Sequence, residues 1–256
     1  MEMFDSHSHY NDEKFDEDRE EIIKQVYNSG VTKLIVAGYN LESSKEAVKI
    51  ANNYDFIYAI CGVSPNDVND LPSDYLDNIR AQAQNSKVVA IGEIGLDYYW
   101  NKENKELQKR IFKEQIELAN ELNLPIVIHT REAVMDTIDI LKNQVKCENK
   151  GVFHCCPLNI ELIKEALKLG YYISFAGPIT FKNSKNANQV IEMVPLERIL
   201  VETDSPYLSP EPLRGRRNDS RNVKYMISKI AEVKNIEIQE AAKATYENAK
   251  KIFKIK

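Results

Sequence analysis

Short apolar runs alternate with longer amphipathic stretches along the whole chain. The apolar runs are rich in β-branched and aromatic residues, which is typical of strands buried on both faces of a parallel sheet. The pattern therefore predicts eight strands, at 2–7, 33–38, 56–62, 88–95, 124–129, 151–154, 171–177 and 198–204.

The stretches between these runs repeat apolar residues at helical spacing, and several end in Gly or Asn, a common helix stop. They predict helices over 17–30, 42–53, 104–123, 132–144 and 159–170, and a closing helical region over roughly 221–254. The predicted strands recur about every 28 residues, the length of one strand-helix unit. Eight such units favour an α/β fold of the (β/α)8 TIM barrel type, with residues 1–256 as one domain. A doubly wound open sheet is the alternative, but the chain lacks G-x-G-x-x-G after its first strand.

Composition narrows the class of protein. No apolar run approaches the ~20 residues that span a bilayer, and the N-terminal residues lack the basic and apolar regions of a signal peptide. Four cysteines, which are too few for a disulfide scaffold, indicate reduced thiols and a cytoplasmic location: Cys61, Cys147, Cys155 and Cys156. The net charge of −5 excludes a broadly basic surface. A phosphate-bearing substrate would then need a local positive site or a metal.

The chain has only four histidines, and each comes at the end of a predicted strand: His7, His9, His129 and His154. Residues two apart in a strand face the same side, so His7 and His9 can bind one ion. Active sites of TIM barrels form at the C-terminal ends of the strands. The four imidazoles therefore point to a single site.

Two carboxylates complete this pattern, because Glu93 and Asp204 end the fourth and eighth predicted strands. Imidazole and carboxylate together suit zinc, manganese, magnesium or iron. Any one histidine taken alone is more simply a packed or surface residue, but six such residues in register favour a metal centre. The cysteines form no C-x-x-C pair and are interpreted as packing residues.

Over nearly its whole length the chain resembles the TatD family of metal-dependent deoxyribonucleases, within the amidohydrolase superfamily. The resemblance rests on the order and spacing of 5-DSHSH-9, 92-GEIGLDYY-99, 125-PIVIHTR-131, 153-FHC-155, 195-PLERILVETDSPYLSP-210 and 214-RGRRN-218. It implies a TIM-barrel hydrolase that holds two divalent ions, Mg, Mn or Zn, and acts on single-stranded DNA or 3′ ends as a 3′→5′ exonuclease. It implies no obligate protein partner and no membrane.

The resemblance also implies roles for the six residues. One metal would be held by His7, His9, Glu93 and Asp204, and the second by Glu93, His129 and His154, with Glu93 bridging. Glu93 and Asp204 would be the catalytic carboxylates, and Asp204 would take a proton from the attacking water. Two close cations can activate a water and stabilise both oxygens of a displacement at phosphorus.

Three segments depart from the family pattern. Ser64, in 62-GVSPND-67, stands where the family usually has a histidine that could touch phosphate. The chain reads 154-HCCPLN-159 where the family usually has Phe-Ser-Gly after its His-Cys pair, and 218-NDSRN-222 lacks a common proline. None of these departures removes a metal ligand.

Further residues are candidates for substrate binding. Arg131 follows His129 by two and can clamp a phosphate, or else form a salt bridge at the strand end. A group of three arginines in the loop after the eighth strand is a candidate DNA-backbone contact, or else a solvated basic loop: Arg214, Arg216 and Arg217.

Two more features carry open alternatives. Asp5 can orient a ligand imidazole, or it can be a strand-start residue with no role at the metals. The aromatic run Tyr98, Tyr99 and Trp100 can stack an unpaired base, although at least one of its rings is expected to pack the loop.

Two other classes of function compete with the nuclease. An amidohydrolase-type enzyme would act on an amide, lactone or amine of a small molecule, often through a carboxylated lysine, but the fourth strand offers Glu93 instead. A non-enzymatic binding protein would not need an open two-metal mouth.

Overall fold

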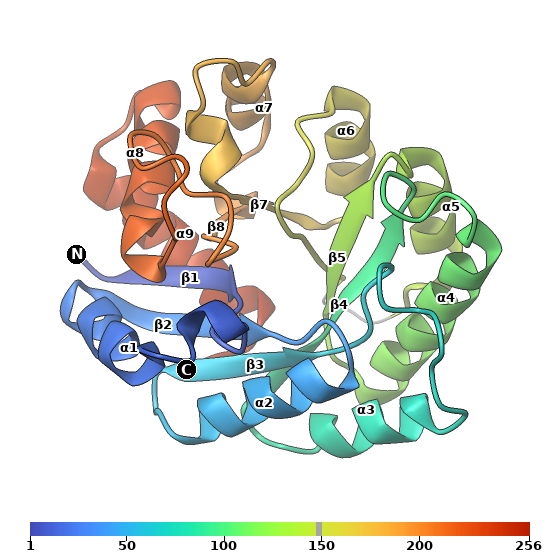
Figure 1. Cartoon of the computed structure of the whole chain (residues 1–256). Helices are drawn as coiled ribbons and strands as arrows, with labels where there is room; N and C mark the ends of the chain where they lie inside the picture. The colour runs from blue at the N-terminus through green and yellow to red at the C-terminus, as the bar shows by residue number, and fades with distance from the viewer. Residues whose placement is uncertain (147–149) are drawn as a thin grey trace.

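The computed structural model describes residues 1–146 and 150–256, and in these ranges eight parallel strands pair in chain order around a barrel (Figure 1). The strands are β1 (Met3–Ser8), β2 (Val31–Ala37), β3 (Ile57–Cys61), β4 (Val88–Asp97), β5 (Ile126–Arg131), β6 (Gly151–Phe153), β7 (Tyr172–Phe175) and β8 (Ile199–Val201). All eight predicted strands are confirmed within a few residues. The predicted TIM barrel is therefore the observed fold.

The residues after β8 complete the barrel, because β8 and β1 are the two ends of the paired sheet. The Asp204 N–H donates to the His7 carbonyl at 3.0 Å, and the His9 N–H donates to the Ser205 carbonyl at 2.7 Å. Ser8 and Ser205 form a parallel bridge. The segment that closes the barrel thus also carries Asp204 to its mouth.

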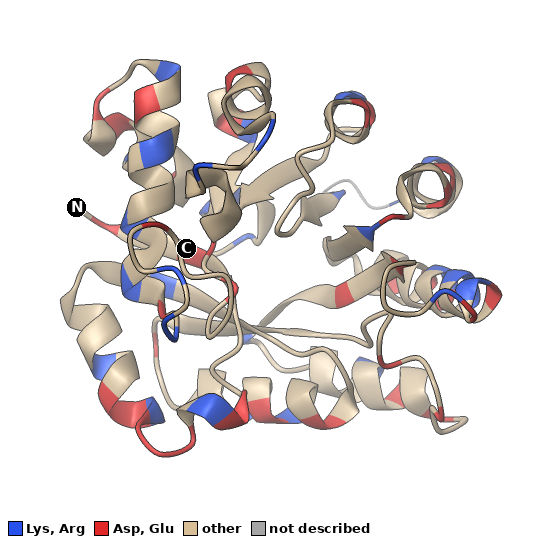
Figure 2. Ribbon diagram, turned by 45° about the horizontal axis from the view of Figure 1, so that its top comes forward, with Lys and Arg blue, Asp and Glu red and all other residues tan. Residues whose placement is uncertain are grey.

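Helices surround the sheet, and Figure 2 shows acidic and basic residues interspersed on them while the strands are mostly uncharged. The helices are α1 (Arg19–Asn28), α2 (Leu41–Asn52), α3 (Tyr75–Ala83), α4 (Lys105–Leu122), α5 (Val134–Gln144), α6 (Ile160–Lys168), α7 (Ala187–Met193), α8 (Val223–Lys234) and α9 (Ile238–Ile252). The named sequence patterns miss α3 and α7, which have only nine and seven residues. The closing region is two helices because Asn235 adopts a left-handed conformation, φ 52°, that ends α8.

Apolar side chains fill the space between the sheet and the helices. A second cluster joins strand residues such as Phe4 and Ile35 to Phe253 after α9. α9 packs against β1 and β8, the strands at the closure of the barrel. The helix α9 therefore helps to hold the two ends of the sheet together, and it lies outside the mouth of the barrel.

The predicted boundary of the fourth strand is wrong, because β4 continues to Asp97. Gly95 resembles a strand end in sequence, but here φ is 148° and a Cβ would lie 1.9 Å from the His129 carbonyl oxygen. Glycine is thus needed for close approach of two strands rather than for a turn. Glu93 therefore lies inside β4, at a register shift between Ile91 and Ile94.

The described cysteines, Cys61, Cys155 and Cys156, are free thiols. Cys61 and Cys156 are buried in the core, which fits their interpretation as packing residues, whereas Cys155 is only partly buried and does not belong to the core. Cys147 lies outside the described residues. Among the described helices, none is both long and apolar enough to cross a bilayer.

Candidate metal centre

The six predicted ligands converge at the mouth of the barrel around Glu93. Its Oε2 lies 3.4 Å from His7 Nε2, on β1. Its Oε1 lies 3.0 Å from His129 Nδ1, on β5, and 3.3 Å from His154 Nε2, just after β6. The two oxygens of one carboxylate therefore face two different groups of imidazoles.

The first group consists of His7, His9 and Asp204, and we call it the first half-site. His9 Nε2 lies 3.3 Å from His7 Nε2 and 3.2 Å from Asp204 Oδ1. The distance from His7 Nε2 to Asp204 Oδ1 is 3.8 Å. These three ligand atoms come from β1, from the residue directly after it, and from the closing segment after β8.

The second half-site consists of His129 and His154, with Glu93 shared between both half-sites. His129 Nδ1 and His154 Nε2 lie 3.2 Å apart. His7 and His154 stack with ring centroids 4.1 Å apart, so the two half-sites are in direct contact.

The donor set fits divalent cations. Ligands bonded at about 2.0–2.2 Å in tetrahedral geometry lie roughly 3.3–3.6 Å from one another. The nitrogen and oxygen atoms of each half-site lie close to this spacing. In each half-site two imidazole nitrogens face one another, and a cation can accept the lone pairs of both. Both half-sites can therefore each hold one ion.

Electrostatics keep the two carboxylates ionised, as ligation requires. Burial by itself would raise the pKa of Glu93, but the imidazoles of His154, His129 and His7 outweigh it and hold that pKa well below its usual range. Burial would also raise the pKa of Asp204, but the neighbouring His9 more than offsets burial and lowers that pKa to about 2.

Two further carboxylates, which sequence reasoning missed, orient the second half-site. Asp97 Oδ2 lies 2.9 Å from His129 Nε2, and Glu202 Oε1 lies 3.4 Å from His154 Nδ1. Both carboxylates are almost fully buried. A carboxylate on the far nitrogen fixes the orientation of a ligand imidazole and raises its basicity. The signal was present in the sequence, since both residues belong to the quoted motifs 92-GEIGLDYY-99 and 195-PLERILVETDSPYLSP-210.

Asp5 does not take the first of the two roles expected for it, that of orienting a ligand imidazole. It does not bond to a ligand imidazole; its carboxylate accepts from the Thr203 N–H at 2.9 Å and from Thr203 Oγ1 at 2.5 Å. Burial raises the pKa of Asp5 to about 7. Asp5 therefore anchors the backbone next to Asp204 and so positions the first half-site indirectly.

The comparison with known families decides the assignment. The family model described as TatD related DNase matches residues 4–254. The chain belongs to this family. The matched residues include the whole barrel and all six ligands.

Similar proteins from two bacteria support the same assignment. The chain is 43% identical over 253 residues to YabD of Bacillus subtilis, named a metal-dependent hydrolase, with 99% of both chains covered. It is 35% identical to YcfH of Escherichia coli K12, also named a metal-dependent hydrolase, covering 100% of this chain and 97% of the relative. The crystal structure of YjjV, a TatD homologue from E. coli K12, has a TM-score of 0.94 at 27% identity, covering 99% and 98% of the two chains. This TatD-family chain is a metal-dependent hydrolase.

The segments that depart from the TatD pattern have structural partners here. The Ser64 hydroxyl donates to Asp67 Oδ2 at 2.7 Å. The Cys155 N–H donates to Glu202 Oε1 at 2.6 Å, and the Asn159 side chain caps α6. Asn218 bonds to the carbonyls of Thr203 and Tyr207 at 2.9 and 2.7 Å. These contacts order the loops around the mouth without the family's usual residues.

The four candidate arginines differ in how they are held. Arg131 is exposed, with its guanidinium 3.9 Å from the Tyr99 ring centroid. Arg214 lies 4.3 Å from the Phe181 ring centroid. Arg217 pairs with Asp18 and donates to the Lys14 carbonyl at 2.7 Å.

Arg216 is exposed, and its guanidinium has no ion-pair partner within residues 1–146 and 150–256. Its contact is through the backbone, where its carbonyl accepts from Ser209 Oγ at 2.5 Å. In this loop Arg216 is therefore available to a ligand, whereas Arg217 is already engaged.

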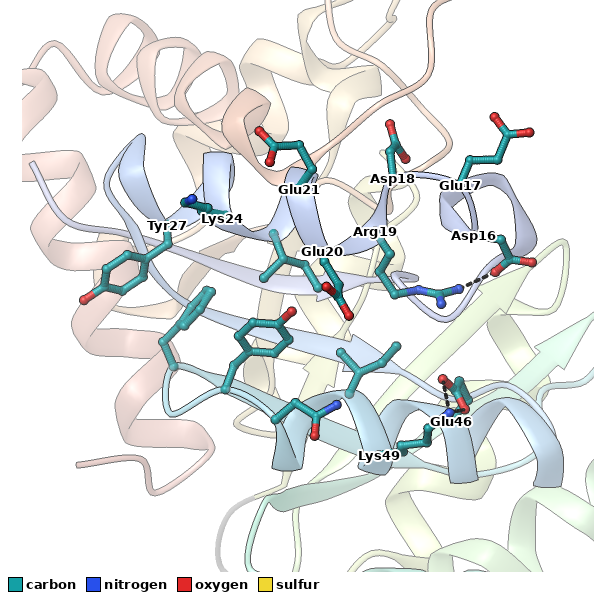
Figure 3. A pocket seen from close by; sticks show the side chains of 15 residues that line it. Asp16, Glu17, Asp18, Arg19, Glu20, Glu21, Lys24, Tyr27, Glu46 and Lys49 are labelled. Carbon is teal, nitrogen blue, oxygen red and sulfur yellow. Dashed lines mark hydrogen bonds and ion pairs between the residues drawn. The ribbon is translucent and has the colours of Figure 1, made fainter.

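A hollow of about 890 Å³ lies between α1 and α2, away from the six ligands (Figure 3). Two ion pairs form within its charged lining, with Arg19 bonded to Asp16 and Lys49 bonded to Glu46. No predicted site residue lines it. We assign it no catalytic role.

Proposed function

We propose that this protein is a divalent-metal-dependent exodeoxyribonuclease that cleaves phosphodiester bonds from the 3′ ends of DNA. The observation that carries the proposal is the position of Glu93, whose two oxygens face separate imidazole groups. Such a shared carboxylate suits two neighbouring ions, the arrangement that favours displacement at a phosphodiester.

In this proposal His7, His9 and Asp204 hold one ion, and a second is held by His129 and His154, with Glu93 shared. Magnesium, manganese and zinc all suit these ligands. When bound, two such ions lower the pKa of a water and neutralise charge at the reacting phosphate.

The chain's own residues contribute positioning and proton transfer. Asp204 is ionised and lies at the mouth, 3.2 Å from His9, where its carboxylate can accept the proton of the attacking water. The water oxygen then bonds to phosphorus as the bond from phosphorus to the leaving oxygen breaks. Asp97 and Glu202 hold the second half-site imidazoles in place through this step.

Exposed arginines around the mouth provide the local positive charge that an acidic protein needs to bind a polyanion. All four candidate arginines are exposed, and of these Arg217 is already paired with Asp18, which leaves Arg131, Arg214 and Arg216 for the polyanion. We propose single-stranded DNA or a 3′ end as the substrate. The described free thiols fit a cytoplasmic enzyme, which is where we propose that it acts.

The test is a cleavage assay on single-stranded DNA labelled at its 3′ or its 5′ end. It is run after metal removal and then with magnesium, manganese or zinc. We expect metal-dependent shortening from the 3′ end that is lost in Asp204→Asn. The matched control is Asp139→Asn, an exposed carboxylate on α5, which should cleave like the wild type.

Cleavage without added metal by metal-stripped protein would contradict the proposal. So would the absence of cleavage in protein that elemental analysis shows to hold two ions. That second result would favour a small-molecule amide, lactone or amine as the substrate.

A further inference from the structure

The loop after β4 presents two aromatic side chains to solvent beside the metal centre. Trp100 is 67% exposed and Tyr99 is 43% exposed, whereas Tyr98 is buried and donates to Asp136. The Tyr99 and Trp100 rings meet edge to face with centroids 4.8 Å apart. Large exposed aromatic side chains on a protein surface indicate a binding role.

Asp97 connects this aromatic pair to the metal centre. Its Oδ2 bonds to His129, while its Oδ1 accepts from the backbone N–H groups of Tyr99 and Trp100 at 2.9 and 3.0 Å. One carboxylate therefore sets both the orientation of a metal ligand and the position of the two rings. The backbone that carries the two rings is therefore linked to the second half-site through a single side chain.

The loop is also held from outside by Gln108 of α4, which is fully buried. Gln108 accepts from the Asp97 N–H at 2.9 Å and donates to the carbonyls of Asp97 and Asn101 at 3.1 and 3.0 Å. These bonds clamp both ends of the short aromatic segment. A pre-ordered platform binds a flat ligand with a smaller loss of conformational entropy.

A cation lies against the platform. The Arg131 guanidinium is 3.9 Å from the Tyr99 ring centroid and 5.6 Å from that of Trp100, and Arg131 follows the ligand His129 by two residues on β5. No ion pair of Arg131 is found in the described part of the chain. Its N–H groups are thus free to bind a phosphate while its face stacks on Tyr99.

A surface hollow of about 470 Å³ adjoins the two rings and is lined by Asn69 and by residues 101–104, which include both Lys102 and Glu103. Exposed aromatic rings with an adjacent cation are the features with which proteins bind unpaired bases of single strands. A protein partner would not require the link through Asp97 to a metal ligand.

We propose that Tyr99, Trp100 and Arg131 form a subsite for one unpaired nucleobase and its phosphate, which seats the strand beside the metal centre. This inference rests on the proposed nuclease function. It adds that the enzyme recognises a base through its π-face and therefore without regard to its identity. The subsite makes the unpaired base, as well as the phosphate backbone, part of substrate recognition.

The binding test uses Trp100 itself, because it is the only tryptophan in the chain. Protein as purified is titrated with a cleavage-resistant phosphorothioate oligothymidine and with an abasic phosphorothioate chain of equal length. We expect saturable quenching of fluorescence by the oligothymidine, at least about fivefold weaker binding of the abasic chain, and no quenching by it. Equal affinity for both chains, or oligothymidine binding without quenching, would overturn the subsite.

The kinetic test compares Trp100→Ala and Tyr99→Ala with Tyr27→Ala, an exposed aromatic on α1. The first two should raise KM for single-stranded DNA roughly five- to hundredfold and leave cleavage of an abasic phosphodiester chain unchanged, because that chain offers no base to the subsite. Trp100→Phe should recover most of the loss, and Tyr27→Ala should show none. An unchanged KM in both loop variants would overturn the inference.

Different experimental results would refute the proposed nuclease activity and the proposed base subsite. Wild-type protein that cleaves neither DNA nor bis(p-nitrophenyl) phosphate with any metal would refute the nuclease. If oligothymidine still quenches Trp100 in that protein and the abasic chain does not, the base subsite is supported by itself. Normal DNA cleavage with unchanged KM in Trp100→Ala and Tyr99→Ala would refute only the subsite.

Discussion

The two half-sites of the metal centre contain similar ligands but are held in different ways. The first half-site is held by the backbone: His9 Nδ1 lies 3.1 Å from the Ala37 carbonyl, and Asp204 is bonded to His7 through the main chain. The second is held by buried side-chain carboxylates, since Asp97 and Glu202 face the far nitrogens of its imidazoles.

This difference separates two properties of the centre, namely the positions of its candidate ligands and the basicity of their imidazoles. The first half-site forms when the barrel closes, so its shape depends on the same bonds that join β1 to the segment after β8. The second half-site depends on charged partners that contribute little to closure but raise the basicity of its imidazoles. Changes around the first half-site should therefore reduce stability, and changes around the second should reduce metal affinity.

The largest effect is expected from Glu93→Ala, which removes the ligand shared by both half-sites. Under the proposed function, activity should fall by a factor of roughly a thousand or more, because the stabilisation that two ions would give the reacting phosphate is lost. Metal content, measured by elemental analysis, should fall at both half-sites, and circular dichroism should remain that of the wild type. Full activity in this variant would refute the shared-ligand assignment.

The second half-site is tested by Asp97→Asn, which keeps the shape of the side chain and removes its charge. Metal affinity should fall about 10- to 100-fold at one of the two ions, with little change at the other. Competition with a chelator, monitored by metal release, measures both affinities. Asp77→Asn on α3 is the matched exposed control. Equal weakening of both ions would show that the half-sites are not held separately.

The anchor of the first half-site is tested by Thr203→Val, which keeps the shape of the side chain and removes the hydroxyl that bonds to buried Asp5. The free energy of unfolding should fall by about 1–3 kcal/mol, because a buried acceptor loses a donor. Metal affinity of the folded protein should change much less than in Asp97→Asn. Urea unfolding of this variant beside Thr32→Val, a partly exposed threonine, measures the difference.

A smaller difference, in DNA affinity, is expected between variants of the two neighbouring arginines in the loop after β8. Arg216→Ala should weaken DNA binding a few-fold and reduce its salt slope by about one, since an accessible phosphate contact is removed. Arg217→Ala should change DNA binding less, because that guanidinium already pairs with Asp18. Titration of labelled DNA at several salt concentrations measures both slopes. A larger loss in Arg217→Ala would mean that the Asp18 pair opens when DNA binds.

Much of the fold and of the candidate ligand set could be predicted, because both depend on the pattern of apolar and polar residues within short segments. Continuous apolar runs predicted the eight strands, and strand ends predicted which residues reach the mouth. His7 and His9 share a half-site because residues two apart in a strand face one side. The helices α3 and α7 escaped prediction because nine and seven residues offer few periodic positions.

The sequence by itself determined the barrel and the six candidate metal ligands, since strand periodicity and residue type act locally. Tertiary structure alone decided how those ligands are held. Asp5 meets Thr203 across 198 residues, and Arg217 meets Asp18 across 199, so no local pattern records either pair. Asp97 and Glu202 were visible in the motifs, but their orientation toward His129 and His154 depends on the register of neighbouring strands. Which side chains become hydrogen-bond or ion-pair partners depends on tertiary packing, because two segments that are distant in sequence must meet in one place.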